Sequence, residues 1–310
     1  MTEPPFLLNI GHRGARAFAP ENTIPAIRMA RRLGANAVEL DVQMSRDGEL
    51  IVFHDGDVTR CSDGVYKYPL HTDYSVSAFT WDELSALDVG TWYVHELAKT
   101  PRHRQPYLRD ITAEEVEQWI TPADAEEYES GSVRIPRLRD ALVAAHESRL
   151  AVVLELKTLS RRYPSIAGKA LEVVRELDME NQTLITSFDH ALLFDIRRQN
   201  ATIAIGVLTA ERLYRPREYV QALDADAYEP HTDVLCRGVS ADDVDTELIQ
   251  ELTRAGVRVN VWTENSESRM RTLIDAGVTG LFSDYPNRLA RVLASTGCEL
   301  PDRPRMRRLT

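Results

Sequence analysis

Acidic and histidine side chains near the start of the chain have types and spacings that suit metal-dependent acid–base chemistry. Glu39 and Asp41 are two residues apart in an apolar run, and a β-strand would point both carboxylates to the same face. Two carboxylates on one face can bind a single hard cation. His12 and His54 lie before and after this pair, and histidine exchanges protons most readily near neutral pH. A single histidine is often structural and two acids can simply face solvent, so the joint pattern carries the prediction.

A further acid–base pair, Glu155 and Lys157, closes another apolar run in the same i, i+2 arrangement. Burying an unpaired charge is expensive, so these two side chains either pair with each other or meet a metal and an anionic ligand. Phe188 and Trp262 also end or follow β-rich runs, where each could pack in the core or contact a ligand. The candidates therefore gather at the ends of predicted strands.

The elements that must position these residues alternate along the chain. Eight β-rich runs are separated by stretches with helical periodicity, which is the pattern of repeated strand–helix units. The predicted strands are Leu7–His12, Ala37–Gln43, Leu150–Lys157, Thr183–Ser187, Thr202–Leu208, Ala225–Glu229, Val257–Trp262 and Thr279–Ser283. Predicted helices include Thr23–Leu33, Leu138–Glu147, Ala167–Leu177, Val244–Ala255 and Glu267–Ala276.

Eight such units predict a closed (β/α)₈ TIM-type barrel in one domain of residues 1–300. Functional groups of this fold project from the carboxyl ends of different strands into one mouth, which matches where the candidates fall. An open doubly wound sheet is the alternative, but its glycine fingerprint GxGxxG is absent from the chain.

A long insertion of about residues 57–134 separates the second and third units. Leu50–His54 before it has the composition of a short extra strand. Because Asp110–Val133 contains many acids and no Lys or Arg, a solvated helical flap is expected there, with a lid or a homo-oligomer contact as the alternative. Residues 301–310 form a basic C-terminal tail, which we expect to be a frayed end.

Composition excludes several classes of function. The net charge of −11 argues against binding to nucleic acid, whose phosphates attract basic surfaces. No apolar run approaches the roughly 18 residues of a membrane span, and no signal-like start is present, so a soluble cytoplasmic protein is expected. Cys61, Cys236 and Cys298 have no metal-site or disulfide spacing, which predicts reduced structural thiols.

Ordered motifs throughout the chain resemble those of the glycerophosphodiester phosphodiesterase family. The matching segments are His12-Arg13-Gly14, Pro20-Glu21-Asn22-Thr23, Glu39-Leu40-Asp41-Val42, Asp47-Gly48, Val52, His54-Asp55, Ile135-Pro136-Arg137-Leu138, Glu155-Leu156-Lys157, Ser187-Phe188, Val261-Trp262-Thr263 and 280–286. The resemblance implies a (β/α)₈ barrel that hydrolyses a small-molecule glycerophosphodiester to glycerol 3-phosphate and an alcohol.

The resemblance also implies roles for the candidate residues. Glu39, Asp41 and Glu155 would hold one divalent cation, Mg²⁺ or Ca²⁺, and His12 and His54 would act as general acid and base in an order left open. The chemistry agrees, because carboxylates without clustered Cys or His ligands favour a hard ion. Phosphate and substrate contacts would come from a small set of cationic and aromatic side chains: Arg13, Lys157, Phe188 and Trp262.

The insertion leaves the identity of the substrate open. It is expected to choose the alcohol end, with Trp92 or Trp262 stacking on a sugar or a choline. Residues 59–64 and Ser283–Pro286 depart from the family pattern and are expected to carry no chemistry. The alternatives are a lysophospholipase D-like enzyme, a sugar-phosphodiester hydrolase, and a non-catalytic protein that only binds glycerophosphodiesters.

Overall fold

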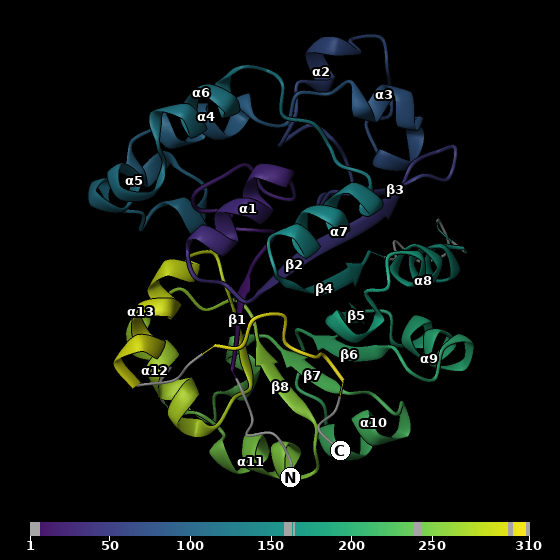
Figure 1. Ribbon diagram of the computed structural model, residues 1–310, viewed down its shortest axis with the longest axis vertical. Helices are drawn as coiled ribbons and strands as arrows, with labels where there is room; N and C mark the ends of the chain where they lie inside the picture. Colours follow the sequence, from purple (N-terminus) through teal and green to yellow (C-terminus); the bar gives the residue numbers. More distant parts are fainter. Residues whose placement is uncertain (1–6, 158–162, 164, 239–242, 297–299, 308–310) are drawn as a thin grey trace.

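Eight parallel strands close into a barrel in the computed structural model, which describes residues 7–157, 163, 165–238, 243–296 and 300–307. The ring closes because β1 pairs with both β2 and β9 (Figure 1). The strands are β1 (Leu8–Gly11), β2 (Ala37–Met44), β4 (Ala151–Leu156), β5 (Thr183–Ser187), β6 (Ala204–Thr209), β7 (Ala227–Pro230), β8 (Arg258–Val261) and β9 (Gly280–Ser283). The predicted extra strand is present as β3 (Leu50–Val52), antiparallel to β2. The barrel prediction is therefore confirmed.

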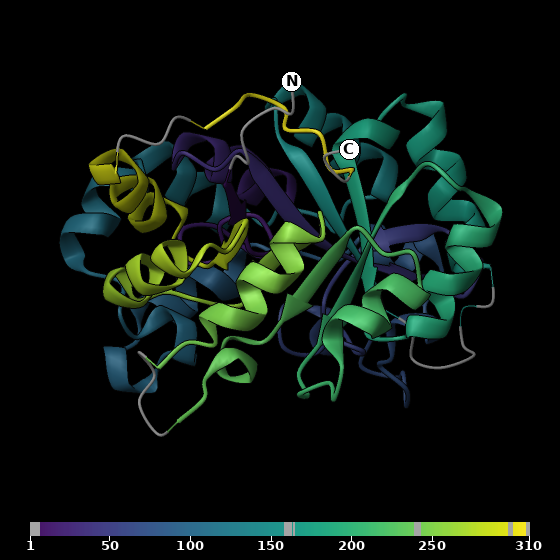
Figure 2. The same ribbon diagram turned by 90° about the horizontal axis from the view of Figure 1, so that it is seen from below.

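Helices surround the barrel and cover the outer faces of its strands, as Figure 2 shows. They are α1 (Ile24–Arg32), α7 (Leu138–Glu147), α8 (Ile166–Glu176), α9 (His190–Gln199), α10 (Pro216–Ala222), α11 (Thr246–Arg254), α12 (Glu267–Ala276) and α13 (Pro286–Thr296). Local signals set their ends: Thr23 caps α1 by accepting a hydrogen bond from the Ala26 amide, and Gly277 ends α12 at φ 99°. The five predicted helices are confirmed to within two residues at each end.

Apolar side chains fill the interior of the barrel, including its amino-terminal end. Its core comprises Leu8, Ile10, Ala37, Ala151, Val153, Leu184, Ala204, Ala227, Phe282 and Met306. Met306 belongs to the C-terminal tail and is fully buried, and its amide donates to the Asn181 carbonyl at 2.9 Å. Arg258 inside the barrel donates to the Arg305 carbonyl at 2.9 Å. The expectation of a frayed end is therefore wrong for residues 301–307, which cross this end of the barrel (yellow in Figure 2).

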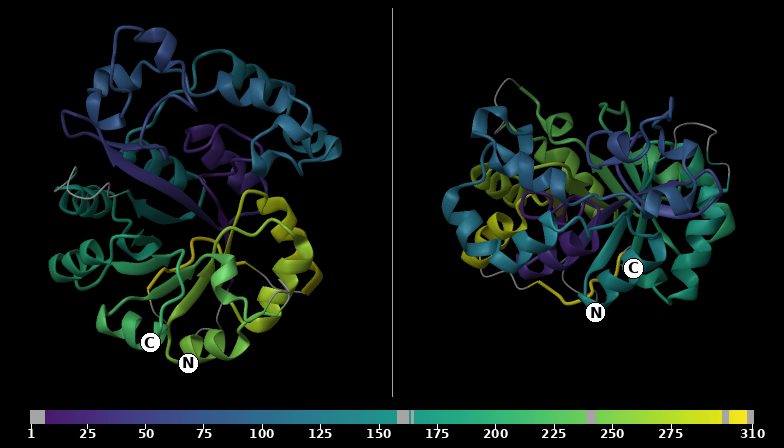
Figure 3. Two further views of the ribbon diagram at one scale, coloured as in Figure 1. Left: turned by 180° about the vertical axis from the view of Figure 1, so that it is seen from behind. Right: turned by 90° about the horizontal axis from the view of Figure 1, so that it is seen from above.

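The insertion packs against one side of the barrel beside α1 and β2 (Figure 3). It contains α2 (Gly64–Lys67), α3 (Trp81–Ser85), α4 (Thr91–Ala98), α5 (Ala113–Trp119) and α6 (Pro122–Glu129), with short 3₁₀ turns at Val76–Ala78, Pro101–His103 and Pro106–Leu108. The acidic stretch is helical as predicted, but the insertion also has buried aromatic residues. Tyr93 and Tyr128 contact edge to face, and the Tyr93 hydroxyl donates to the Ala17 carbonyl at 2.7 Å. Within the described ranges, no helix is both long and apolar enough to cross a membrane.

Candidate active site

Strand register brings the three predicted metal ligands together. Asp41 on β2 lies opposite Glu155 on β4, and Glu39 is one strand repeat earlier on the same face. One oxygen from each of the three carboxylates lies within 4.8 Å of the others, and all three residues are buried. The barrel thus concentrates negative charge at one point near the carboxyl ends of its strands.

This cluster has the properties of a cation site. Burial raises the pKa of Glu39 well above its usual value, and repulsion from Asp41 and Glu155 adds to the rise. The Glu39 Oε1 atom is buried, and no hydrogen-bond donor is found for it among the described residues. Lys157 offsets part of the charge, with Nζ 3.0 Å from Asp41 Oδ1 and 2.7 Å from Glu155 Oε1. Three oxygen donors with incomplete compensation fit a hard divalent cation.

His12 is held by an ionised carboxylate, which binds its Nδ1 atom. Its Nδ1 lies 2.7 Å from Asp284 Oδ1, and Arg16 donates to both oxygens of that carboxylate. Although burial opposes ionisation, Arg16 and His12 keep the pKa of Asp284 far below its usual range, so Asp284 accepts and His12 Nδ1–H donates. The other ring nitrogen, Nε2, faces Glu39 at 3.9 Å. Burial, assisted by Arg16, lowers the pKa of His12 to about 4, which keeps the ring neutral near pH 7.

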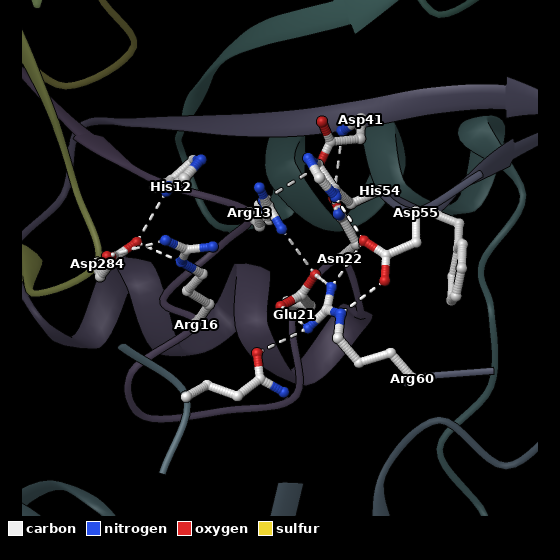
Figure 4. Close-up of polar contacts among 12 residues, drawn as sticks. His12, Arg13, Arg16, Glu21, Asn22, Asp41, His54, Asp55, Arg60 and Asp284 are labelled. Carbon is white, nitrogen blue, oxygen red and sulfur yellow. Dashed lines mark hydrogen bonds and ion pairs between the residues drawn. The ribbon is translucent and has the colours of Figure 1, made fainter. Parts of the chain in front are cut away.

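His54 is held in the same way by its sequence neighbour (Figure 4). Its Nδ1 lies 2.7 Å from Asp55 Oδ1, and Arg60 donates to both Asp55 oxygens at 2.6 and 2.9 Å. Burial would raise the pKa of Asp55, but the hydrogen bond from His54 and the charge of Arg60 keep it well below its usual range. Each histidine therefore has an aspartate–arginine pair behind it.

A chain of ion pairs connects the carboxylate cluster to Arg60. Arg13 donates to Glu21 at 2.9 Å, and its amide donates to Glu39 at 2.8 Å. Burial would raise the pKa of Glu21, but Arg13 and Arg60 lower it to about 2. Glu21, His54 and Asp55 could form a second acidic metal group, but Arg60 already lies between the two carboxylates. The negative charge of this second group is thus neutralised by Arg60 rather than left for a metal ion.

A cavity of about 220 Å³ opens in front of these groups. Its lining is His12, Arg13, Arg16, Glu39, His54, Glu155, Lys157, Thr186, Phe188, Leu208, Trp262, Thr263 and Phe282. Phe188 and Trp262 meet edge to face with ring centroids 5.6 Å apart. Of the predicted site residues, Asp41 alone is absent from the lining, because it lies behind the cavity, where Asn22 donates to it at 2.7 Å.

Comparison with known proteins identifies the family of this chain. A model described as the glycerophosphoryl diester phosphodiesterase family matches residues 12–288. The chain belongs to this family. The predicted enzyme class, glycerophosphodiester phosphodiesterase, is confirmed at the family level.

Two relatives carry the name glycerophosphodiester phosphodiesterase. The one from Caldanaerobacter subterraneus subsp. tengcongensis is 28% identical over 290 residues, covering 94% of this chain and 99% of the relative. The one from Bacillus altitudinis is 27% identical, covering 91% and 96%. A solved Oleispira antarctica phosphodiesterase, in complex with its product sn-glycerol-3-phosphate, shares the fold with a TM-score of 0.71 at 24% identity, over 92% of this chain and 96% of that one.

Several residues of this phosphodiesterase site escaped prediction. Asp284 and Arg60 lie in the two segments expected to carry no chemistry, yet Asp284 accepts a hydrogen bond from His12, and Arg60 donates to Asp55, the partner of His54. Asp284 immediately follows β9, so its position at a strand end was the available signal. Arg60 gave no such signal, because its partners become neighbours only after folding.

The insertion does not form the wall of the phosphodiesterase cavity. No residue of 57–134, all of which the structure describes, lines it. Trp92, expected to stack on a ligand, instead donates its indole N–H to the Val89 carbonyl at 2.8 Å and lies beside Arg60. The structure therefore does not support selection of the alcohol by direct contact with the insertion.

A further buried carboxyl group was also missed. Glu229 on β7 is fully buried, and its Oε1 accepts from Asn260 at 2.9 Å. A Cβ on Gly206 would lie 3.0 Å from Glu229 Oε2 and 3.3 Å from Thr186 Oγ1, so these groups meet where β6 has no side chain. Burial raises the pKa of Glu229 to about 7. Thr186 lines the cavity, which places Glu229 next to its floor.

Proposed function

We propose that the protein is a metal-dependent hydrolase that cleaves glycerophosphodiesters to glycerol 3-phosphate and an alcohol. The observation that carries this proposal is the convergence, on one cavity, of a buried carboxylate cluster and two histidines held by aspartates. Family membership supports the reaction class.

The metal would be one divalent cation, Mg²⁺ or Ca²⁺, held by Glu39, Asp41 and Glu155. When bound, it would supply positive charge that polarises a phosphoryl oxygen. Arg13 and Lys157 lie beside the cluster and would offset the remaining charge of the phosphodiester. The uncompensated Glu39 oxygen supports this assignment.

His12 and His54 would divide the proton transfers. One would remove a proton from the attacking water molecule, and the other, in its protonated form, would give a proton to the departing alkoxide. Because Asp284 and Asp55 each accept from Nδ1, Nε2 is the nitrogen of each ring that is left to exchange a proton with the substrate. An imidazole held in one tautomer needs no rearrangement before proton transfer.

The substrate would be compact. An adjoining cavity of about 180 Å³ shares His54, Glu155, Lys157 and Phe188 with the main one. Two cavities that meet at the carboxylate cluster suit a phosphodiester with two small substituents, such as glycerophosphocholine or glycerophosphoethanolamine. Phe188 and Trp262 would contact one of these substituents. A cytoplasmic location is proposed as well, since Cys61 is a buried free thiol.

The test is release of glycerol 3-phosphate from a panel of glycerophosphodiesters. Chelator-treated protein is resupplied separately with Mg²⁺, Ca²⁺ and Mn²⁺, and metal-dependent release is expected. His12→Ala and His54→Ala should each lower kcat by about 100-fold or more, whereas the exposed His103→Ala should not. Calorimetric binding of these compounds without any release would instead identify a non-catalytic binding protein.

A further inference from the structure

The two aspartate–arginine pairs have a common neighbour in the insertion. Arg16 holds Asp284 behind His12, and Arg60 holds Asp55 behind His54. Arg16 lies in the β1–α1 loop, whereas Arg60 lies at the start of the insertion. Both guanidinium groups are contacted by residues 105–107, which we call the bridging segment.

The bridging segment touches each arginine by a different interaction. The Gln105 side-chain oxygen accepts a hydrogen bond from Arg60 Nη1 at 3.1 Å. The Tyr107 ring lies over Arg16, with the guanidinium carbon 4.1 Å from the ring centroid, which is cation–π geometry. Gln105 and Tyr107 are only two residues apart, so one short segment contacts the aspartate–arginine pairs of both histidines.

The bridging segment is itself anchored on two sides. The backbone amide of Gln105 donates to Glu96 Oε1 at 2.6 Å, and Glu96 on α4 is buried. The Tyr107 carbonyl accepts from the Tyr285 hydroxyl at 2.5 Å, and Tyr285 directly follows Asp284. Contacts to α4 and to the loop after β9 thus hold the segment in place.

We propose that the bridging segment is a positioning element, which holds Arg16 and Arg60 so that Asp284 and Asp55 keep both histidines in the Nδ1–H tautomer. Arginine is long and loses much conformational freedom when it is held, so an external partner reduces its freedom to leave the carboxylate. The inference rests on the proposed function and deepens it. The insertion would then influence the rate of turnover rather than the choice of alcohol, in keeping with its absence from the cavity wall.

The test uses substitutions that remove these contacts without touching the cavity. The double variant Gln105→Ala/Tyr107→Leu loses both the hydrogen bond to Arg60 and the cation–π contact with Arg16. Tyr107→Phe should preserve the cation–π contact, because it keeps the ring, and the Tyr107 hydroxyl has no partner in the described part of the chain. Gln118→Ala is a matched control at an exposed position of α5. For the double variant we expect kcat to fall by about 10-fold or more, with KM and thermal midpoint close to wild type.

A second readout does not depend on turnover. Nitrogen NMR of ¹⁵N-histidine-labelled protein distinguishes Nδ1–H from Nε2–H, and we expect the double variant to lose the single Nδ1–H state of His12 or His54. An unchanged kcat, or a changed alcohol preference at constant kcat, would overturn the inference while leaving the proposed function intact. If the wild type releases no product, the proposed function fails, and unchanged tautomers in the double variant would then refute the positioning role independently.

Discussion

Replacing the buried carboxyl group of Glu229 should change how stability depends on pH. In the folded protein, burial raises the pKa of Glu229 from 4.5 to about 7. The unfolded chain therefore gives up this proton at lower pH than the folded one. Between pH 4.5 and 7 the unfolded state binds fewer protons, so the free energy of unfolding falls as pH rises and is constant above about 7.

The size of this effect follows from the two pKa values. A difference of about 2.5 in pKa corresponds to about 3 kcal/mol of stability lost between pH 4.5 and 7. Glu229→Gln has nearly the same shape, keeps an oxygen for the Asn260 amide, and lacks the titration. Relative to wild type, the variant should therefore become more stable by up to about 3 kcal/mol as the pH is raised from 4.5 to 8.

Urea unfolding of chelator-treated wild type and Glu229→Gln, followed at several pH values from 5 to 8, measures this difference. An amide that packs less well than the acid would lower the stability of the variant equally at every pH. The diagnostic quantity is therefore the difference in slope. Two parallel curves over this range would show that the folded protein does not hold the proton at Glu229, and would refute the reasoning.

Three further substitutions probe other parts of the molecule. Asp284→Asn removes the charge that orients His12, so steady-state kinetics should show kcat lowered about 10- to 100-fold; wild-type kcat would contradict the orienting role. Glu39→Gln removes an uncompensated ligand oxygen, and calorimetric titration with Mg²⁺ or Ca²⁺ should show affinity weakened at least about 10-fold, an outcome that unchanged affinity would exclude. Met306→Ala should lower the free energy of unfolding by about 2–5 kcal/mol while the exposed Arg307→Ala does not, and equal stabilities would mean that the tail contributes nothing.

Local periodicity was enough to predict the barrel. Each unit buries one apolar strand and one face of a helix, so its pattern is visible within a short window of sequence. The carboxylates on β2 and β4 and the histidines could be predicted for the same reason, since strand ends of a barrel meet in one mouth.

Contacts between distant segments left no such local pattern. Asp284 and Arg16 are 268 positions apart, and neither lies in a periodic run that would indicate a partnership. Met306 stands between Arg305 and Arg307, in a segment with the composition of a solvated tail, although its side chain fills the barrel end. In the insertion, acidic composition correctly indicated exposed helical faces but concealed the tyrosines beneath them.

The pairing of β2 with β4 has a consequence for how this enzyme can diverge. The two strands are directly hydrogen-bonded from Ala37↔Ala151 to Val42↔Leu156, although the whole insertion lies between them in the sequence. The insertion can therefore lengthen, shrink or be exchanged between lineages without moving the proposed cation ligands. If the bridging segment positions the histidines as proposed, such changes would alter the rate of turnover while leaving the affinity for the cation unchanged.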